Sequence, residues 1–453
     1  MLAKTAKAFL LVSISIYFLK WLFFWLYETN DSYFYYAFAE FMKSGKYFVP
    51  HPYYWTIPST LEPPLYSIFL YLAQFFARAE IIIHLGQIAA ILFSGFVVYQ
   101  IIKTYIKKSI ALTVTSIYLL IPANFFQSSS LMAESLAIFS VSLYLYLAFL
   151  IIAQKKEHLT KYLILFSAII ILVRYNFISL FFLSLLFLAA KKKALILNGF
   201  FVFLGFLVIA GWILVNHQLN GSWGLSDQMG KNLYNRVVGG DRLVPSADDK
   251  NWLRLKEMVG EKFDLFQPTY NIEPFISSNF ESVASESQFF AGIAAAALIK
   301  NPLSYLTNTF FNFFIIHKSG LPYPDNLYTY GRYMGGACEI LGTISLCQPV
   351  IKSPYAAPIW NFLVKYSEVY YSFLPGLINF FLLFPAILFA LIQKKPFFRF
   401  AAVLYIIEVI TIIIPEVPVI RYIYPLFPIK VILITYLITQ VVQFRNKILT
   451  GAV

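Results

Sequence analysis

Long apolar segments, separated by short polar ones, run through most of the sequence. A helix that crosses a membrane needs about 20 predominantly apolar residues. Longer segments of this kind lie at 8–27, 81–102, 131–153, 194–215, 373–392, 398–414 and 420–440, and 14-residue segments lie at 109–122, 160–173 and 177–190. The pattern predicts an all-α polytopic membrane protein with about ten transmembrane helices, within a range of 10–13.

The composition supports this fold class. Of the 453 residues, 59% are hydrophobic and 13% are charged, whereas a soluble domain is roughly 45–50% apolar and about 25% charged. This balance excludes a soluble enzyme, a disordered chain and a nucleic-acid-binding protein. The net charge of +13 then indicates cytoplasmic loops beside an anionic leaflet. Two cysteines exclude a disulfide scaffold and a cysteine-based zinc site.

Basic residues predict the topology, because cytoplasmic loops carry an excess of Lys and Arg. Such residues cluster at 4–7, 103–108, 155–161, 191–193, 394–399 and 445–447. All these clusters face the cytoplasm if ten segments cross the membrane, both termini are cytoplasmic, and 64–77 and 303–317 lie at the outer interface as amphipathic helices.

This topology predicts three parts of the chain. They are an N-terminal membrane bundle (1–215) with a first outer loop (28–80), an outer loop region with interfacial helices (216–372), and C-terminal transmembrane helices (373–453). We expect a multi-pass protein of a cell (inner or plasma) membrane whose active site faces the outside or the periplasm.

Acidic residues mark the predicted first outer loop. Asp31 begins the pattern D-x-x-x-Y-x-x-x-A-x5-G, which continues with Tyr35, and Glu62 directly precedes a Pro-Pro-Leu-Tyr stretch. An acid at a helix start is also favoured by capping and by the helix dipole, and Glu62 also fits a solvated loop acid. The proline pair predicts the start of an interfacial helix at this point.

Three more charged residues lie at predicted outer ends of spans: Glu134, Arg174 and Arg421. An acid at membrane depth is costly and is a functional candidate by default, although Glu134 also fits a hydrated residue at the boundary. A guanidinium can bind a phosphate through two parallel hydrogen bonds. Arg174 and Arg421 also fit side chains that extend to the lipid headgroups.

Taken in order, these motifs resemble the GT-C class of membrane glycosyltransferases, in the branch of protein O-mannosyltransferases and aminoarabinose transferases. The resemblance covers nearly the whole chain. It rests on Asp31 with Tyr35, Ala39 and Gly45; Pro63-Pro64-Leu65-Tyr66; Leu131 to Glu134; Val173-Arg174; Lys231-Asn232-Leu233-Tyr234; Asn301-Pro302-Leu303-Ser304-Tyr305; and Arg421-Tyr422 with Pro425 and Pro428. One departure is Ser32 after Asp31, where many relatives carry Glu. Another is the absence of the W-W-D motif of oligosaccharyltransferases, which disfavours asparagine-linked transfer.

The resemblance implies an inverting transferase that moves a sugar from a polyprenyl-phosphate donor to a hydroxyl of a lipid, glycan or protein acceptor. Asp31 would be the general base, and Arg421 and Arg174 would bind the donor phosphate. Further substrate-binding residues would be Tyr35, Glu62, Tyr66, Glu134, Asn232, Tyr234 and Tyr422. Glu62 and Glu134 could instead hold a divalent metal ion, and no other cofactor is implied.

Two other classes of membrane protein share part of this pattern. A flippase or transporter of lipid-linked sugars would also need an arginine that contacts phosphate, but no general base. An O-antigen ligase or polymerase is also polytopic with a large outer loop, but relies mainly on outer basic residues. The acidic motif in the first outer loop and the R-Y-x-x-P motif near the C-terminus, in this order, favour the transferase.

The two cysteines, Cys338 and Cys347, both fall in the predicted outer region. Outer compartments permit disulfides, whereas the cytosol does not. We therefore expect a disulfide between them, the alternative being two buried thiols.

Overall fold

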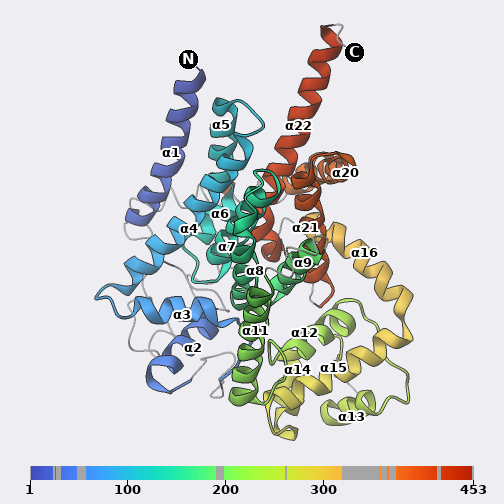
Figure 1. The fold of residues 1–453 in the computed structure, drawn as a ribbon. Coiled ribbons are helices and arrows are strands. Elements are labelled where there is room, and N and C mark those ends of the chain that lie inside the picture. Colours follow the sequence, from blue (N-terminus) through green and yellow to red (C-terminus); the bar gives the residue numbers. More distant parts are fainter. Residues whose placement is uncertain are drawn as a thin grey trace.

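The computed structural model describes residues 2–23, 26, 32–47, 58–189, 198–260, 263–318, 358, 365–366, 374–415 and 420–450. These residues form helices and no strand (Figure 1). The helices long and apolar enough to cross a membrane are α1 (Leu2–Phe23), α4 (Ala79–Ile102), α7 (Glu134–Ile152), α11 (Gly199–Asn220), a helix over Leu374–Ile392 that ends in α20 (Phe384–Ile392), α21 (Pro396–Ile413) and α22 (Phe427–Leu449). Each matches one long apolar segment of the sequence, so the prediction of a polytopic helical membrane protein is confirmed.

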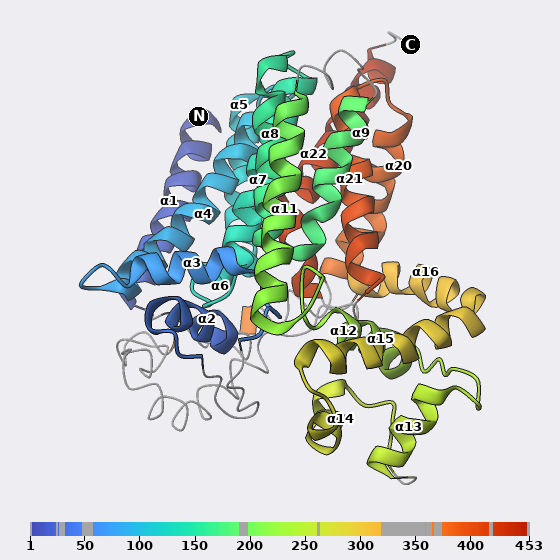
Figure 2. The same cartoon turned by 60° about the horizontal axis from the view of Figure 1, so that its bottom comes forward.

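The 14-residue segments also form helices, which are too short to cross a bilayer alone. They are α5 (Lys108–Leu119), α8 (Thr160–Ile169) and α9 (Ile178–Ala189). A helix of 12 residues is about 18 Å long, against a hydrocarbon core of about 30 Å. Short 3-10 turns lengthen two of them: η2 (Ile170–Leu172) follows α8, and η3 (Tyr175–Phe177) precedes α9. These helices stand among the long ones (Figure 2).

Some helices run across one end of the bundle instead of along it. These are α2 (Ser32–Ser44), α3 (Pro64–Ala73) and α16 (Pro302–Lys318), at the end away from both termini (Figure 2). Helix α3 begins at the proline pair as predicted, with Pro63 at the N-cap. Proline suits this place because its missing N–H would have no partner in the first turn anyway.

Three predicted helix boundaries were wrong by several residues, one of them the end of α22, which lies at Leu449 instead of near 440. Helix α11 continues to Asn220 instead of ending near 215, because Gly221, with φ of 79°, provides the left-handed residue that closes it. Helix α1 begins at Leu2 instead of residue 8. The apolar pattern did not predict this start, because Lys4 and Lys7 lie before the apolar segment and yet belong to the helix.

A separate helical subdomain (residues 229–300) lies beyond the same end of the bundle as α2 and α3 (Figure 2). It contains α12 (Met229–Tyr234), the π-helix η4 (Asn235–Gly240), α13 (Lys250–Val259), α14 (Thr269–Ile276) and α15 (Val283–Lys300). It has its own apolar core. Helix α12 lies so close to α15 that a Cβ on Gly230 would be 1.9 Å from the Ser287 carbonyl oxygen.

Helix α7 lies at the centre of the bundle. It packs against α4, α8, α21, α22 and the 3-10 helix η9 (Ile420–Leu426). Its first residue is Glu134, whose side chain is fully buried. Glu134 therefore lies inside the bundle, where α7 meets η9 and α8.

Candidate functional site

The first-loop motif contacts the segment that leads into α7. The Ser32 hydroxyl donates a hydrogen bond of 2.7 Å to the Leu131 carbonyl oxygen. Helix α2 begins at Ser32, and its first eight residues are buried. Asp31, the predicted base, lies outside the described residues. Ser32, which follows Asp31 in the chain, is thus hydrogen-bonded to the segment that leads to Glu134.

Tyr35, one turn further along α2, bonds to a second predicted residue. Its hydroxyl donates a hydrogen bond of 2.6 Å to Oε2 of Glu62. Its ring meets the Tyr66 ring edge to face, with 4.9 Å between the centroids. Burial, followed by the nearby Glu62 carboxylate, raises the pKa of Tyr35 well above its usual 10. The phenol therefore stays protonated and remains a donor.

Tyr66, in α3, is joined to α4 and to the loop before α7. Gln87 Nε2 donates to the Tyr66 hydroxyl at 3.0 Å and to the Ser130 carbonyl oxygen at 2.5 Å. Burial and the charge of Glu134 raise the pKa of Tyr66 well above 10. Gln87, a polar residue in the apolar helix α4, thus connects α3 to the loop before α7.

Glu134 and Arg174 form a buried ion pair, with 2.7 Å between Oε1 and Nη2. The exposed fractions of the side chains are 0% for Glu134 and 12% for Arg174. The Arg174 guanidinium also lies over the Tyr422 ring of η9, 5.2 Å from its centroid. Both charges act on the Tyr35 hydroxyl: Glu134 raises its pKa and Arg174 lowers it.

Six predicted residues therefore lie in one cluster, although they come from separate parts of the chain. We call Tyr35, Glu62, Tyr66, Glu134, Arg174 and Tyr422 the acidic cluster. It combines two carboxylates, one guanidinium and three tyrosine rings, and the phenols of Tyr35 and Tyr66 remain protonated. Such a set offers hydrogen-bond acceptors for sugar hydroxyls and a cation for a phosphate.

The loop that carries Glu62 is held by residues that the sequence did not single out. Tyr175 donates to the Thr60 carbonyl oxygen at 2.9 Å. Asp227 accepts hydrogen bonds from the Thr60 amide at 3.1 Å and from Asn220 Nδ2 at 3.1 Å. Burial raises the pKa of the Asp227 carboxyl from 3.8 to about 6.

Other predicted site residues lie elsewhere. The Tyr234 hydroxyl donates to the Leu265 carbonyl oxygen at 2.8 Å inside the core of the helical subdomain, and Asn232 belongs to the same helix, α12. The described hydrogen bond of Tyr234 is therefore made within the subdomain and not with the acidic cluster. The side chain of Arg421, and the cysteines Cys338 and Cys347, lie outside the described residues.

Glu62 and Glu134 do not fit a divalent metal ion in this arrangement. Oε1 of Glu134 contacts the Arg174 guanidinium, and Oε2 of Glu62 accepts from Tyr35. A cation at this place would repel a metal ion. Within the described ranges, no three His, Cys, Asp or Glu side chains lie close enough to hold a metal.

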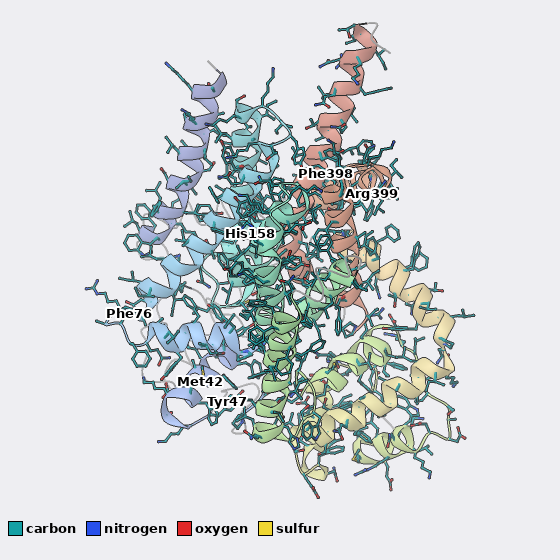
Figure 3. The ribbon with its side chains drawn as sticks, viewed as in Figure 1. Met42, Tyr47, Phe76, His158, Phe398 and Arg399 are labelled. Carbon is teal, nitrogen blue, oxygen red and sulfur yellow. The ribbon has the colours of Figure 1, made fainter. Side chains whose placement is uncertain are left out.

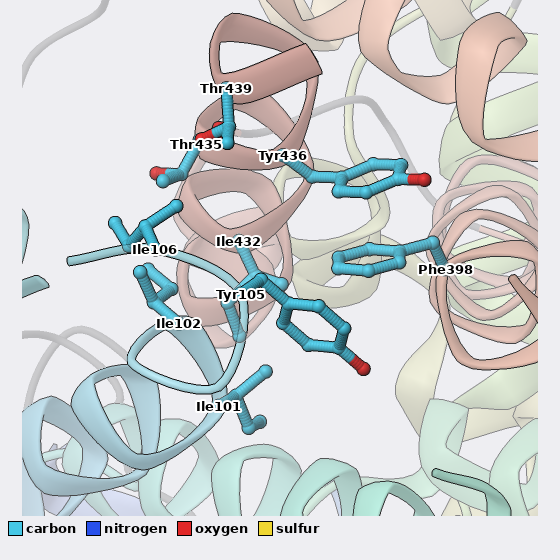
Figure 4. Close-up of a pocket in the computed structure, with 9 residues that line it drawn as sticks. All are labelled: Ile101, Ile102, Tyr105, Ile106, Phe398, Ile432, Thr435, Tyr436 and Thr439. Carbon is cyan, nitrogen blue, oxygen red and sulfur yellow. The ribbon is translucent and has the colours of Figure 1, made fainter. Parts of the chain in front are cut away.

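A small pocket lies at the other end of the bundle, between α4, α21 and α22 (Figure 4). Its volume of about 10 Å³ is roughly what one water molecule needs. The rings of Phe398 and Tyr436 stack in its wall, with 3.6 Å between centroids. Figure 3 places Phe398 far from Met42 and Tyr47, which belong to the α2 region. This pocket cannot hold a sugar.

No protein-family model matches the sequence, and no curated protein does either. Among solved structures, the chain is similar to ArnT from Cupriavidus metallidurans in its apo state, with 12% identity and a TM-score of 0.37 over 95% of this chain and 77% of that one. It is also similar to the same protein bound to undecaprenyl phosphate, with 11% identity and a TM-score of 0.38 over 96% and 77% of the two chains. Likenesses of this size assign neither an activity nor site residues.

Proposed function

We propose that this protein is an inverting glycosyltransferase. It would move a sugar from a polyprenyl-phosphate donor to a hydroxyl acceptor at the outer face of the membrane. The observation that carries the proposal is the meeting of Tyr35, Glu62, Tyr66, Glu134, Arg174 and Tyr422 in one cluster. Charged groups at membrane depth are costly and are kept where they serve function.

The leaving phosphate gains negative charge as the glycosidic bond breaks. Arg174 and Arg421 would stabilise that charge most in the transition state, which is what lowers the barrier. The carboxylates of Glu62 and Glu134 would accept hydrogen bonds from sugar or acceptor hydroxyls. A single displacement at the anomeric carbon inverts its configuration.

Asp31 would take the proton from the attacking hydroxyl. Support comes from its chain neighbour Ser32, which bonds to the Leu131 carbonyl oxygen beside the cluster. Asp31→Asn keeps the size of the side chain and removes its basicity, so turnover should fall by roughly 10²-fold or more. Glu40→Gln, at a half-exposed acid of α2, should retain turnover. Wild-type turnover in Asp31→Asn would refute this role.

Arg421 would bind the donor phosphate through two parallel hydrogen bonds, an arrangement that lysine does not reproduce. Arg421→Lys should therefore weaken donor use by roughly tenfold or more, as expected for loss of about 1.5–3 kcal/mol from a charge-assisted hydrogen bond. Arg445→Lys is the matched control, because Arg445 is exposed near the other end of α22. Equal donor kinetics in both variants would contradict the assignment.

Purified protein distinguishes the transferase from its two rivals. Incubation with a polyprenyl-phosphate sugar and a hydroxyl acceptor should give a glycosylated product with inverted configuration. A flippase would move the donor between leaflets and form no product. An O-antigen ligase or polymerase would transfer a whole glycan and would tolerate Asp31→Asn.

A further inference from the structure

Glu408 is a buried acid inside a membrane-spanning helix and lies outside the acidic cluster. It belongs to α21, five residues before the helix ends at Ile413, and its exposed fraction is 0%. Burying an ionisable side chain at membrane depth is unfavourable, so such residues usually serve a specific contact. One oxygen, Oε2, has no hydrogen-bond partner in the described structure.

The other carboxyl oxygen of Glu408 contacts the start of α9. The Ser179 hydroxyl donates to Oε1 of Glu408 and lies 2.9 Å from the Asn176 carbonyl oxygen. Ser179 is the second residue of α9, directly after η3. Helix α21 also packs against η3 and α9 over several residues. Glu408 therefore holds the segment that connects α8 to α9.

That segment presents Arg174. The Arg174 backbone is extended, with φ of −151° and ψ of 129°, so the chain changes direction there between η2 and η3. Just after Arg174, the Tyr175 hydroxyl bonds to the Thr60 carbonyl oxygen. Further along, Ser179 bonds to Glu408. These two contacts hold the segment that follows Arg174 to two different parts of the structure.

We infer that Glu408 is a positioning residue for Arg174. Its bond to Ser179 sets the turn over residues 173–179, and the turn sets where the Arg174 guanidinium lies against Glu134 and Tyr422. The inference deepens the proposed function, because a correctly placed Arg174 is what would bind the donor phosphate. Glu408 itself touches neither substrate nor reacting atoms in this scheme.

The test combines hydrogen exchange with lipid binding on the full-length protein in detergent. Ser179→Ala and Glu408→Leu should speed amide exchange within residues 173–179 by about tenfold, the effect of losing a hydrogen bond of ordinary strength. Glu408→Gln keeps an oxygen that accepts from Ser179 and should restore slow exchange. Tyr405→Phe is the control, since it removes a buried 2.7 Å hydrogen bond from the same helix to His317 on α16.

Binding of undecaprenyl phosphate then tests the link to Arg174. Ser179→Ala should weaken binding by about tenfold in the wild-type background and cause no further loss in Arg174→Ala, because coupled residues are not additive. A role in general stability would weaken binding equally in both backgrounds.

The outcomes separate this inference from the proposed function. Unchanged exchange over 173–179 in Ser179→Ala overturns the positioning role, whatever the lipid does. Equal losses of binding in both backgrounds overturn it too. Faster exchange in a protein that never binds undecaprenyl phosphate supports the positioning of Arg174 and refutes the transferase.

Discussion

The Arg174 guanidinium and the Glu134 carboxylate form a buried ion pair at 2.7 Å, although they lie 40 residues apart in the chain. The sequence suggested an isolated arginine available to a phosphate and a separate acid available to a sugar. The pair means instead that each side chain fixes the other. Under the proposed function, a donor phosphate would meet a guanidinium already held in place. Oε2 of Glu134 has no hydrogen-bond partner among the described residues.

The ion pair should dominate the stability of this part of the bundle. Removing one partner of a buried pair leaves an uncompensated charge and costs about 3–5 kcal/mol. Glu134→Ala should therefore lower the apparent melting temperature in detergent strongly. Glu80→Ala is the control, because Glu80 also lies in the first turn of a spanning helix but is only partly buried.

The double variant Glu134→Ala/Arg174→Ala provides the second half of this prediction. It removes both charges, so its loss of stability should be smaller than the sum of the two single losses. The difference, which is the coupling energy, should be at least about 1 kcal/mol. Additive losses would show that the pair contributes no coupling energy.

Tyr35→Phe should disturb the acidic cluster without a change of shape. The variant removes the 2.6 Å hydrogen bond to Glu62, and a hydrogen bond to a charged group contributes about 1.5–3 kcal/mol. We expect transfer activity to fall by roughly tenfold or more, measured as product formation at saturating donor. Tyr71→Phe in the neighbouring α3 is the control, since the described residues offer its hydroxyl no hydrogen bond. Equal activity of the two variants would contradict a role for the Tyr35 hydroxyl.

Apolar length predicted the spanning helices, because it is a property of consecutive residues. All seven long segments became helices of spanning length, and the proline pair correctly marked the start of α3. The ends of α1 and α11 were harder to predict, because they depend on capping and on charged residues that continue a helix. The sequence predicted an outer region over residues 216–372. It did not predict that residues 229–300 form a subdomain with its own core.

The site was predicted as a set of residues but not as a set of contacts. The order of the motifs predicted that Tyr35, Glu62 and Tyr66 belong to one site. In the structure, Tyr35 contacts both of the other residues. The motif that contains Tyr234 has the expected spacing, yet its hydroxyl bonds inside the subdomain core. Glu408 could have been recognised as an acid within an apolar span, but its partner Ser179 could not, because that contact arises only from packing of α21 against α9.

Asp227 should make stability depend on pH. Burial raises its pKa from 3.8 to about 6, so the folded protein holds this proton more tightly than the unfolded chain does. Stability should therefore fall as pH rises from about 4 to about 6, and the loss should persist above pH 6. A shift of this size corresponds to on the order of 3 kcal/mol.

Melting curves of Asp227→Asn test this dependence. The variant keeps an oxygen for the Thr60 amide and Asn220 but does not titrate, so its melting temperature should drop less between pH 4 and pH 7 than that of the wild type. Asp248→Asn is the control at an exposed acid and should follow the wild type. Parallel curves for wild type and Asp227→Asn would contradict the raised pKa.

The predicted topology places α2 outside the cell membrane and the loop after α7 inside. Lys46 follows α2, Lys156 follows α7, and both are exposed. The 19-residue α7 is about 28 Å long, close to the thickness of the hydrocarbon core, so it separates its two ends by nearly one bilayer. In a background without Cys338 and Cys347, Lys46→Cys should react with an impermeant maleimide added to intact cells, and Lys156→Cys should react only after the membrane is opened. Labelling of Lys156→Cys alone in intact cells would reverse the topology and move the acidic cluster to the cytoplasmic face, where nucleotide sugars are the available donors.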